Sequence, residues 1–222
     1  MYKFLFKLLA SRQLKFEEGQ ITLLKQPIEM LPASFFVGLT KYFLQKQKTD
    51  KNSLSEIYLI GWFVAYVYTS VFEEKYKTKS FVDRYRLGMD IVGMAGFGDY
   101  KSIKFEEGKL SYVYSLNNPI PKYFYPAKEP VDHILRGVTA GGGMSVHHNL
   151  VQCVEEECAA VTGGDRCVLI NATEDKFSDM GKEDLLKKQV DLDFIVPRQK
   201  ECLKNFDKYK KGKFDPWKCL FS

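Results

Sequence analysis

The sequence lacks the motifs that nucleotide-using and iron–sulfur enzymes carry. Its glycine-rich segment GMAGFGDYK has neither the phosphate-loop spacing nor the dinucleotide fingerprint, because no Gly-Lys-Ser/Thr follows it and no predicted strand precedes it. The segment is typical of a helix that ends on glycine caps. The cysteines do not have an iron–sulfur spacing either. The sequence therefore offers no recognisable source of hydride or electrons.

The chain also lacks a concentrated basic run and a long apolar segment. Its net charge of +5 is dispersed over 222 residues, so we expect no direct binding of nucleic acid. The longest apolar run, residues 57–72, contains Gly61, Trp62 and several tyrosines and falls short of a membrane span. Lys7 interrupts the N-terminal apolar run, which is too short for a signal peptide. We therefore expect a cytoplasmic protein without a membrane-spanning segment.

Neither a disulfide framework nor a domain linker is evident. Five cysteines is an odd number, and their uneven spacing argues against a disulfide-based scaffold in a chain of this size. No stretch rich in Gly and Ser divides the chain. We expect one domain over residues 1–222, with an N-terminal arm over 1–13 and a C-terminal extension over about 174–222. The 17 Phe and 13 Tyr suit an aromatic core or a pocket for an apolar ligand.

The hydrophobic patterning predicts a mixed α+β fold, in which antiparallel hairpins pack with a helical layer. Ser53-Leu54-Ser55-Glu56 has the pattern of a capping box that starts a long helix. That helix is apolar almost all round, so we expect it to be buried centrally. The predicted elements are an amphipathic helix over 2–12, hairpins over 14–30 and about 101–116, helices over 33–45, 53–75, 80–93, 131–146 and 182–190, and strands over 150–161 and 166–172.

Residues 133–169 contain most of the side chains that could bind a metal ion or take part in a reaction. The segment holds all three histidines, three of the five cysteines and the longest glycine run. Gly137, Gly141 and Gly142 would form one smooth helical face, although each costs about 1 kcal/mol relative to alanine in a helix. Either another helix packs very closely on this face or a ligand does. Both alternatives are compatible with a pocket beside this helix.

A zinc site is one interpretation of the cysteines in this segment. Cys158 and Cys167 flank a glycine turn, and thiolates select zinc when carboxylate or imidazole ligands complete a tetrahedron. Glu155 and His133, or Asp132 beside it, could join the two thiols. Strict strand alternation would turn Glu155 and Cys158 to opposite faces, so a bulge or a strand end is required. The equally weighted alternative is a pair of ordinary buried cysteines.

We assign no catalytic residue. His147 and His148 fit a polar helix end, where a protonated imidazole suits the helix dipole. Cys153 alternates with Val151 and is expected to be a small core side chain rather than a reactive thiol. No nucleophile with an orienting carboxylate is recognisable in the sequence.

The arrangement resembles the 4-vinyl reductase domain family, also described as predicted hydrocarbon-binding proteins. The resemblance lies in ITLLKQPIEMLPASFFVGLTKYF and in the glycine-bearing helix followed by VEEEC, a glycine turn and DRCVLI. It implies a fold like that of TRAPP subunits (the NO-signalling and Golgi-transport ligand-binding fold), a small apolar pocket and frequent dimerisation.

The resemblance also implies a zinc site, because the signature binds zinc in phenol-sensing relatives. The family's glutamate and two of its cysteines match Glu155, Cys158 and Cys167. Its first ligand is a cysteine, and the matching position here is Asp132. We expect the adjacent His133 to take this role, because imidazole is the better zinc ligand.

The leading prediction is therefore non-enzymatic binding or sensing of a small hydrophobic molecule in an internal pocket, in a homodimer with a structural zinc site. One alternative is a tetrapyrrole vinyl reductase or an accessory protein of such a reductase, as the family name suggests. Another is a structural subunit of a protein assembly. The residues expected to line the pocket are Tyr85, Tyr112, Tyr114, Val138 and Cys153.

Overall fold

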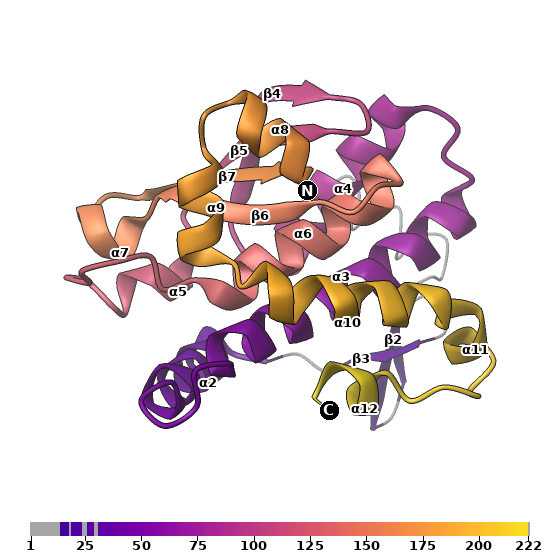
Figure 1. Ribbon diagram of the computed structural model, residues 1–222. Helices are drawn as coiled ribbons and strands as arrows, with labels where there is room; N and C mark the ends of the chain where they lie inside the picture. The colour runs from indigo at the N-terminus through magenta and orange to yellow at the C-terminus, as the bar shows by residue number, and fades with distance from the viewer. Residues whose placement is uncertain (1–13, 18, 24–25, 29–30, 222) are drawn as a thin grey trace.

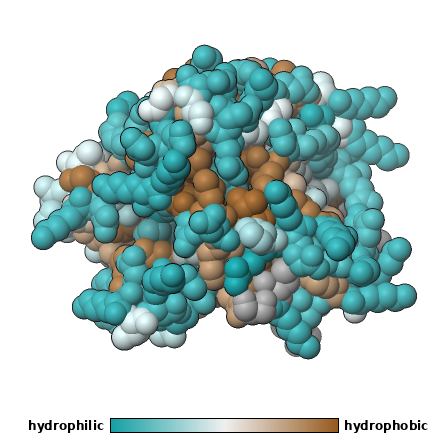
Figure 2. Space-filling view, in the orientation of Figure 1, coloured by the Kyte–Doolittle hydropathy of each residue, from teal (hydrophilic) through white to brown (hydrophobic). Residues whose placement is uncertain are grey.

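The computed structural model describes residues 14–17, 19–23, 26–28 and 31–221 (Figure 1). The helix predicted over residues 2–12 and the N-terminal arm lie outside the described residues. The described part combines two antiparallel sheets with helices, as the predicted α+β class requires. Hydrophilic side chains cover most of the face seen in Figure 2, and a hydrophobic area lies between β6 and α10 in that view.

The N-terminal sheet contains three short strands in sequence order. They are β1 (Leu14–Glu17), β2 (Gln20–Leu23) and β3 (Gln26–Ile28). Gly19 takes a left-handed backbone conformation between β1 and β2, so the hairpin predicted over 14–30 is confirmed and gains a third strand. Leu23 is buried with Phe72 and Leu87, which attaches this sheet to the helices.

The second sheet carries the residues of the candidate sites. Its strand order is β4-β5-β7-β6. Its strands are β4 (Asp99–Glu106), β5 (Leu110–Leu116), β6 (Gln152–Glu157) and β7 (Arg166–Ala172). The predicted hairpin over about 101–116 corresponds to β4 and β5. The strand predicted over 150–161 is wrong in its last residues, because one turn of helix, α7 (Ala159–Thr162), follows β6 and ends on the left-handed Gly163.

The helices before β6 follow the predicted order, except that the short α5 was not predicted. They are α2 (Ala33–Lys46), α3 (Ser53–Tyr76), α4 (Phe81–Met94), the short α5 (Pro119–Lys122) and α6 (His133–His147). The capping box predicted at Ser53 is wrong. The Ser53 hydroxyl donates to the Phe43 carbonyl at 3.1 Å, and the Glu56 carboxylate accepts from Lys46 at 2.6 Å. Both side chains therefore tie α3 to the end of α2 instead of capping α3.

The C-terminal segment contains far more helix than the single helix predicted over 182–190. Its helices are α8 (Glu174–Asp179), α9 (Glu183–Gln189), α10 (Leu192–Lys204), α11 (Phe206–Lys210) and α12 (Pro216–Leu220). In α10 the buried face consists of Ile195, Gln199 and Cys202, a narrow stripe among many charged residues. A stripe with glutamine at its centre gives a weak helical pattern, which explains why the sequence did not predict this helix.

Helices α3 and α6 pack so closely that their contact admits no side chain at three positions. A Cβ atom on Gly141 would lie 1.9 Å from the Trp62 carbonyl oxygen, and one on Gly137 would lie 2.0 Å from the Tyr58 carbonyl oxygen. From the other side, a Cβ atom on Gly61 would lie 2.3 Å from the carbonyl oxygen of Ile134. The glycine face is therefore occupied by a helix at Gly137 and Gly141.

Helix α3 is long and apolar enough to cross a membrane, by length and composition only. From the sequence, the apolar run over residues 57–72 was expected to be too short for a membrane span. Within its most apolar window 44% of the residues are buried inside the protein. Its close contact with α6 and the full burial of Leu59, Trp62 and Phe72 are the properties of a core helix.

Alanine substitutions will separate the glycines that are needed for packing from those that are not. We expect Gly141→Ala to lower the free energy of unfolding by at least about 3 kcal/mol, because the new methyl group meets backbone that cannot move independently. Gly142→Ala is the matched control, since its Cβ would lie at an ordinary 3.5 Å from Thr69 Oγ1. Urea unfolding of both variants measures the difference, and equal stability of the two would contradict the packing described here.

Candidate functional site

A small cavity lies between α4, α6 and the second sheet. Its volume is about 40 Å³, well below the roughly 150 Å³ of a cavity that holds benzene, so an aromatic ligand would have to widen it. The sheet contributes residues of one face, because Ser111 pairs with Asn171 across β5 and β7 and Val113 follows two residues later. The residues that line the cavity are Tyr85, Gly88, Met89, Val92, Tyr100, Ser111, Val113, Thr139, Gly142, Gly143, Val146 and Asn171.

Asn171 brings an unused hydrogen-bond acceptor to this cavity. Its amide nitrogen donates to the Thr139 carbonyl oxygen at 3.2 Å, while its Oδ1 is buried without a hydrogen-bond partner. The amide can approach α6 because a Cβ on Gly143 would lie 1.7 Å from Asn171 Nδ2. Thr139 also lies near Tyr100, with 3.4 Å between the two hydroxyl oxygens. A buried acceptor without a donor is costly, so this position favours a ligand that can donate a hydrogen bond.

His147 supports the wall of the cavity from the end of α6. Its Nε2 lies 2.6 Å from the Ser111 hydroxyl oxygen, and its ring contacts Phe81 with 5.2 Å between centroids. Burial, together with the charges of Arg84 and His148, lowers the pKa of His147 to about 4. The nearby Glu73 carboxylate is engaged with His148 and Arg84. The imidazole is therefore neutral at pH 7.

The depressed pKa of His147 predicts a loss of stability in acid. Its contribution is complete above the ordinary histidine pKa and falls as the pH drops towards 4, because the unfolded chain then binds the proton more readily. We expect the protein to lose about 2 kcal/mol more unfolding free energy between pH 7 and pH 4.5 than His147→Gln does. Urea unfolding at the two pH values measures this difference, and parallel losses in both proteins would refute the assignment.

The structure brings only one of the five predicted pocket residues, Tyr85, to this cavity. Tyr112 and Tyr114 alternate with Val113 and lie on the opposite face of β5, where the Tyr112 hydroxyl donates to the Glu156 carboxylate. Val138 lies beside Gly61 in the contact between α3 and α6. Cys153 is fully buried, as expected of a core thiol, and its backbone N–H donates to the Tyr58 hydroxyl at 3.0 Å.

A second group of predicted residues does converge, at the other end of the sheet. Glu155, Cys158 and Cys167 each place one ligand atom within 4.8 Å of the others, and all three are buried. A β-bulge makes this possible. Glu155 pairs with Leu169 and Glu157 pairs with Val168, which leaves Glu156 as an extra residue. The extra residue restores Cys158 to the face of Glu155, as the sequence required for the two side chains to meet.

The polar groups in this cluster lack sufficient protein partners. Both carboxylate oxygens of Glu155 are buried without a hydrogen bond, and burial together with Cys158 raises the pKa of Glu155 well above its ordinary range. A hydrogen bond from Cys167 lowers the pKa of Cys158 to about 6, and this shared proton raises the pKa of Cys167. The backbone N–H of Ala159 donates to Cys167 Sγ at 3.3 Å. Three acidic groups at one buried point favour a bound cation.

The two residues considered for a fourth ligand lie differently. Asp132 is fully buried, accepts from Asn118 Nδ2 at 2.8 Å through Oδ2 and has no partner at Oδ1. Burial, together with the charge of Glu155, raises the pKa of Asp132 to about 7. The His133 ring instead contacts the Arg136 guanidinium through Nδ1. Neither residue belongs to the group of ligand atoms within 4.8 Å. Asp132 has an unpartnered oxygen and a pKa that responds to Glu155, so it is a better candidate for a fourth ligand than the expected His133.

Gln189 holds Glu155 in place from the edge of the sheet. The Glu155 N–H donates to Gln189 Oε1 at 2.8 Å, and Gln189 Nε2 donates to the Glu155 carbonyl oxygen at 2.7 Å. The amide thus takes the place that a neighbouring strand would occupy beside β6. Arg136 Nη1 donates to the same Gln189 Oε1 at 2.9 Å, which links α6 to this arrangement.

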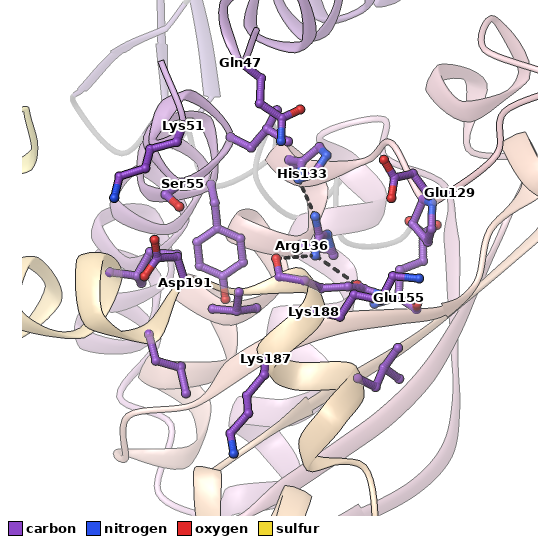
Figure 3. Close-up of a pocket in the computed structure, with 18 of the residues that line it drawn as sticks. Gln47, Lys51, Ser55, Glu129, His133, Arg136, Glu155, Lys187, Lys188 and Asp191 are labelled. Atoms are coloured by element: carbon purple, nitrogen blue, oxygen red, sulfur yellow. Dashed lines mark hydrogen bonds between the residues drawn. The ribbon is translucent and has the colours of Figure 1, made fainter. Parts of the chain in front are cut away.

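A larger cavity of about 710 Å³ lies between α3, α6, α9 and α10. His133 and Arg136 form part of its wall, and Figure 3 shows the two side chains in contact. Charged residues of both signs also border it, and they are Lys51, Lys187, Lys188, Glu129, Glu155, Glu156, Asp191 and Asp193. The sequence predicted no site here, although Arg136 is the only Lys, Arg, Asp or Glu in α6. Asn171 was also not predicted as a site residue, although a polar side chain in the buried strand RCVLINA is unusual.

The fold matches that of a known sensory domain. A search of the solved structures finds the phenol-responsive sensory domain of the transcription activator PoxR with phenol, at a TM-score of 0.67 and 16% identity over 82% of this chain and 96% of that chain. At this identity the similarity shows the fold alone. The predicted α+β fold and the predicted resemblance are confirmed at this level.

Two further solved structures resemble the chain less closely. One is a vinyl-4-reductase family protein from Methanocaldococcus jannaschii, with a TM-score of 0.43, 19% identity and coverage of 65% of this chain and 82% of that chain. The other is a trafficking protein particle complex subunit 3 from Naegleria fowleri covalently bound to palmitic acid, with a TM-score of 0.47, 11% identity and coverage of 63% and 93%. No protein-family model and no curated protein matches the sequence.

Proposed function

We propose that this chain is a ligand-binding sensory domain for a small aromatic or hydrocarbon molecule that carries a hydroxyl group. The observation that carries the proposal is the unpartnered Asn171 Oδ1 at a small cavity with apolar and aromatic lining. A hydroxyl donor on the ligand would satisfy this oxygen, while the apolar part packs against Met89, Val92 and Val113. The shared fold with a phenol-responsive domain supports the same class of ligand.

Phenol and toluene form a matched pair of probes for this proposal. We expect phenol to bind about tenfold more tightly than toluene, because only phenol donates a hydrogen bond to Asn171 Oδ1. Asn171→Leu should remove this preference, and Tyr112→Phe, on the opposite face of the sheet, should keep it. Isothermal titration calorimetry measures both affinities. Equal binding of phenol and toluene to the unaltered protein would exclude Asn171 as the discriminating group.

We also propose a structural zinc ion, held by Asp132, Glu155, Cys158 and Cys167. Two thiolates and two carboxylates are an acceptable zinc donor set, and four protein ligands would leave no open position for catalysis. The unpartnered oxygens of Glu155 and Asp132 support this set. Such an ion would join the start of α6 to β6 and β7 and would offset the negative charge buried there.

Metal analysis of purified variants tests the zinc proposal and its fourth ligand. We expect about one zinc per chain, lost in Cys158→Ser and reduced at least tenfold in affinity in Asp132→Asn. His133→Gln and Cys153→Ala should retain the metal, because the His133 ring is engaged with Arg136 and the Cys153 thiol is not among the grouped ligand atoms. Retention in Asp132→Asn combined with loss in His133→Gln would restore the imidazole as fourth ligand.

We assign no catalytic group in the cavity at Asn171. The tetrapyrrole reductase stays an alternative prediction. The homodimer, the cytoplasmic location and a structural role in an assembly likewise stay predictions. Phenol binding with an intact Asn171 would distinguish a sensory domain from a purely structural subunit, because the latter requires no ligand.

A further inference from the structure

Arg136 is a buried cation without a paired anion among the described residues. Its side chain lies in the wall of the large cavity, and the residue is only 1% exposed. Its hydrogen-bond partners are neutral. Nη1 donates to the backbone oxygen and to Oε1 of Gln189, both at 2.9 Å, and Nη2 contacts His133 Nδ1. An unpaired buried charge is strongly destabilising, so this position favours an external anion.

Glu155 and Asp132 are buried carboxylates whose pKa the Arg136 charge lowers, but neither is hydrogen-bonded to Arg136. Neither carboxylate oxygen of Glu155 has any hydrogen-bond partner, although the Arg136 charge lowers the Glu155 pKa against the effect of burial. The Glu155 carboxylate lies instead with the thiols of Cys158 and Cys167. The guanidinium therefore keeps its hydrogen-bonding capacity for another partner.

The unused donors of Arg136 have the arrangement that a carboxylate requires. Both hydrogens of Nη1 are used on Gln189, whereas Nη2 contacts His133 and Nε is buried without a hydrogen-bond partner, so a ligand reaches this edge only if a side chain in the cavity wall moves. In a planar guanidinium, Nε–H and one Nη2–H lie on the same edge and point in parallel. This edge matches the two oxygens of a carboxylate in a bidentate pair.

The cavity beside Arg136 has room for an organic body attached to such a carboxylate. Its volume of about 710 Å³ lies within the range of sites that hold organic ligands. A single buried cation matches a singly charged head group. Apolar side chains that line the cavity could pack against a hydrocarbon tail, and they are Leu54, Leu185, Val190, Leu192 and Ile195.

We propose that this cavity binds an organic monocarboxylate with an apolar body, whose carboxylate pairs with Nε and Nη2 of Arg136. The site is separate from the cavity at Asn171 and uses a different ligand chemistry. The chain would then take two ligands, one neutral and one anionic. Neither proposal depends on the other, because no residue lines both cavities.

Octanoate and 1-octanol, which share an eight-carbon chain, provide the test on the full-length protein. We expect calorimetry to show octanoate binding at least about tenfold more tightly than 1-octanol, because only octanoate carries the charge that pairs with Arg136. Arg136→Gln should abolish the preference. Leu192→Trp should weaken both ligands by filling the cavity while leaving the guanidinium intact. Phenol binding by these variants should be unchanged.

Each outcome of this experiment decides the proposal. Absence of octanoate binding, equal binding of 1-octanol, or unchanged octanoate binding by Arg136→Gln would overturn it, as would inorganic phosphate binding as tightly as octanoate. Thermal unfolding establishes that the variants fold. If Arg136→Gln does not fold, Leu192→Trp carries the test, and undiminished octanoate binding by that variant would overturn the proposal. If the unaltered protein binds octanoate but not phenol, the proposed function is refuted and the proposal for the Arg136 cavity is not.

Discussion

The contact between α3 and α6 is the constraint on which the other parts of the structure depend. Two carbonyl oxygens of α3 occupy the space that side chains on Gly137 and Gly141 would fill. This close approach fixes the position of α6 relative to the core helix. Helix α6 in turn supplies Thr139 and Gly143 to the small cavity and Arg136 to the large one. Both candidate ligand sites are therefore built on one rigid helix pair. Asp132, the proposed fourth ligand beside Glu155, Cys158 and Cys167, directly precedes α6.

The sequence was sufficient to predict the main elements wherever periodicity and turn chemistry agreed. The central burial of α3, the β4–β5 hairpin and the proline-started α2 followed from such patterns. The C-terminal helices were not predictable in the same way. Their buried stripes are narrow, and in α10 the stripe includes Gln199, which pairs with Gln152 rather than with apolar neighbours. A prediction that relies on hydrophobic side chains does not recognise a buried amide as part of a helix's buried face.

The site residues show a similar division between local and tertiary information. Glu155, Cys158 and Cys167 were expected to meet only if a bulge or a strand end interrupted the strand alternation, and the family resemblance implied the same three residues. The bulge at Glu156 brings them together. The small cavity was not, because apolar character was taken as the sign of a lining residue. On β5 the cavity side carries Ser111 and Val113, while the tyrosines face the other way. Which of two alternating sets faces a helix depends on the strand register, and that is set by partners distant in sequence.

The way Gln189 pairs with the backbone of Glu155 also limits how two copies of this protein could associate. The β6 edge of the sheet is closed at that point by a side-chain amide, so a strand from another molecule cannot add there. The opposite edge, β4, carries the exposed Lys101 and Lys104 and a bulge between Ser102 and Lys104, which disfavour strand addition. Extension of the four-stranded sheet is therefore disfavoured as a way to join two copies of this chain.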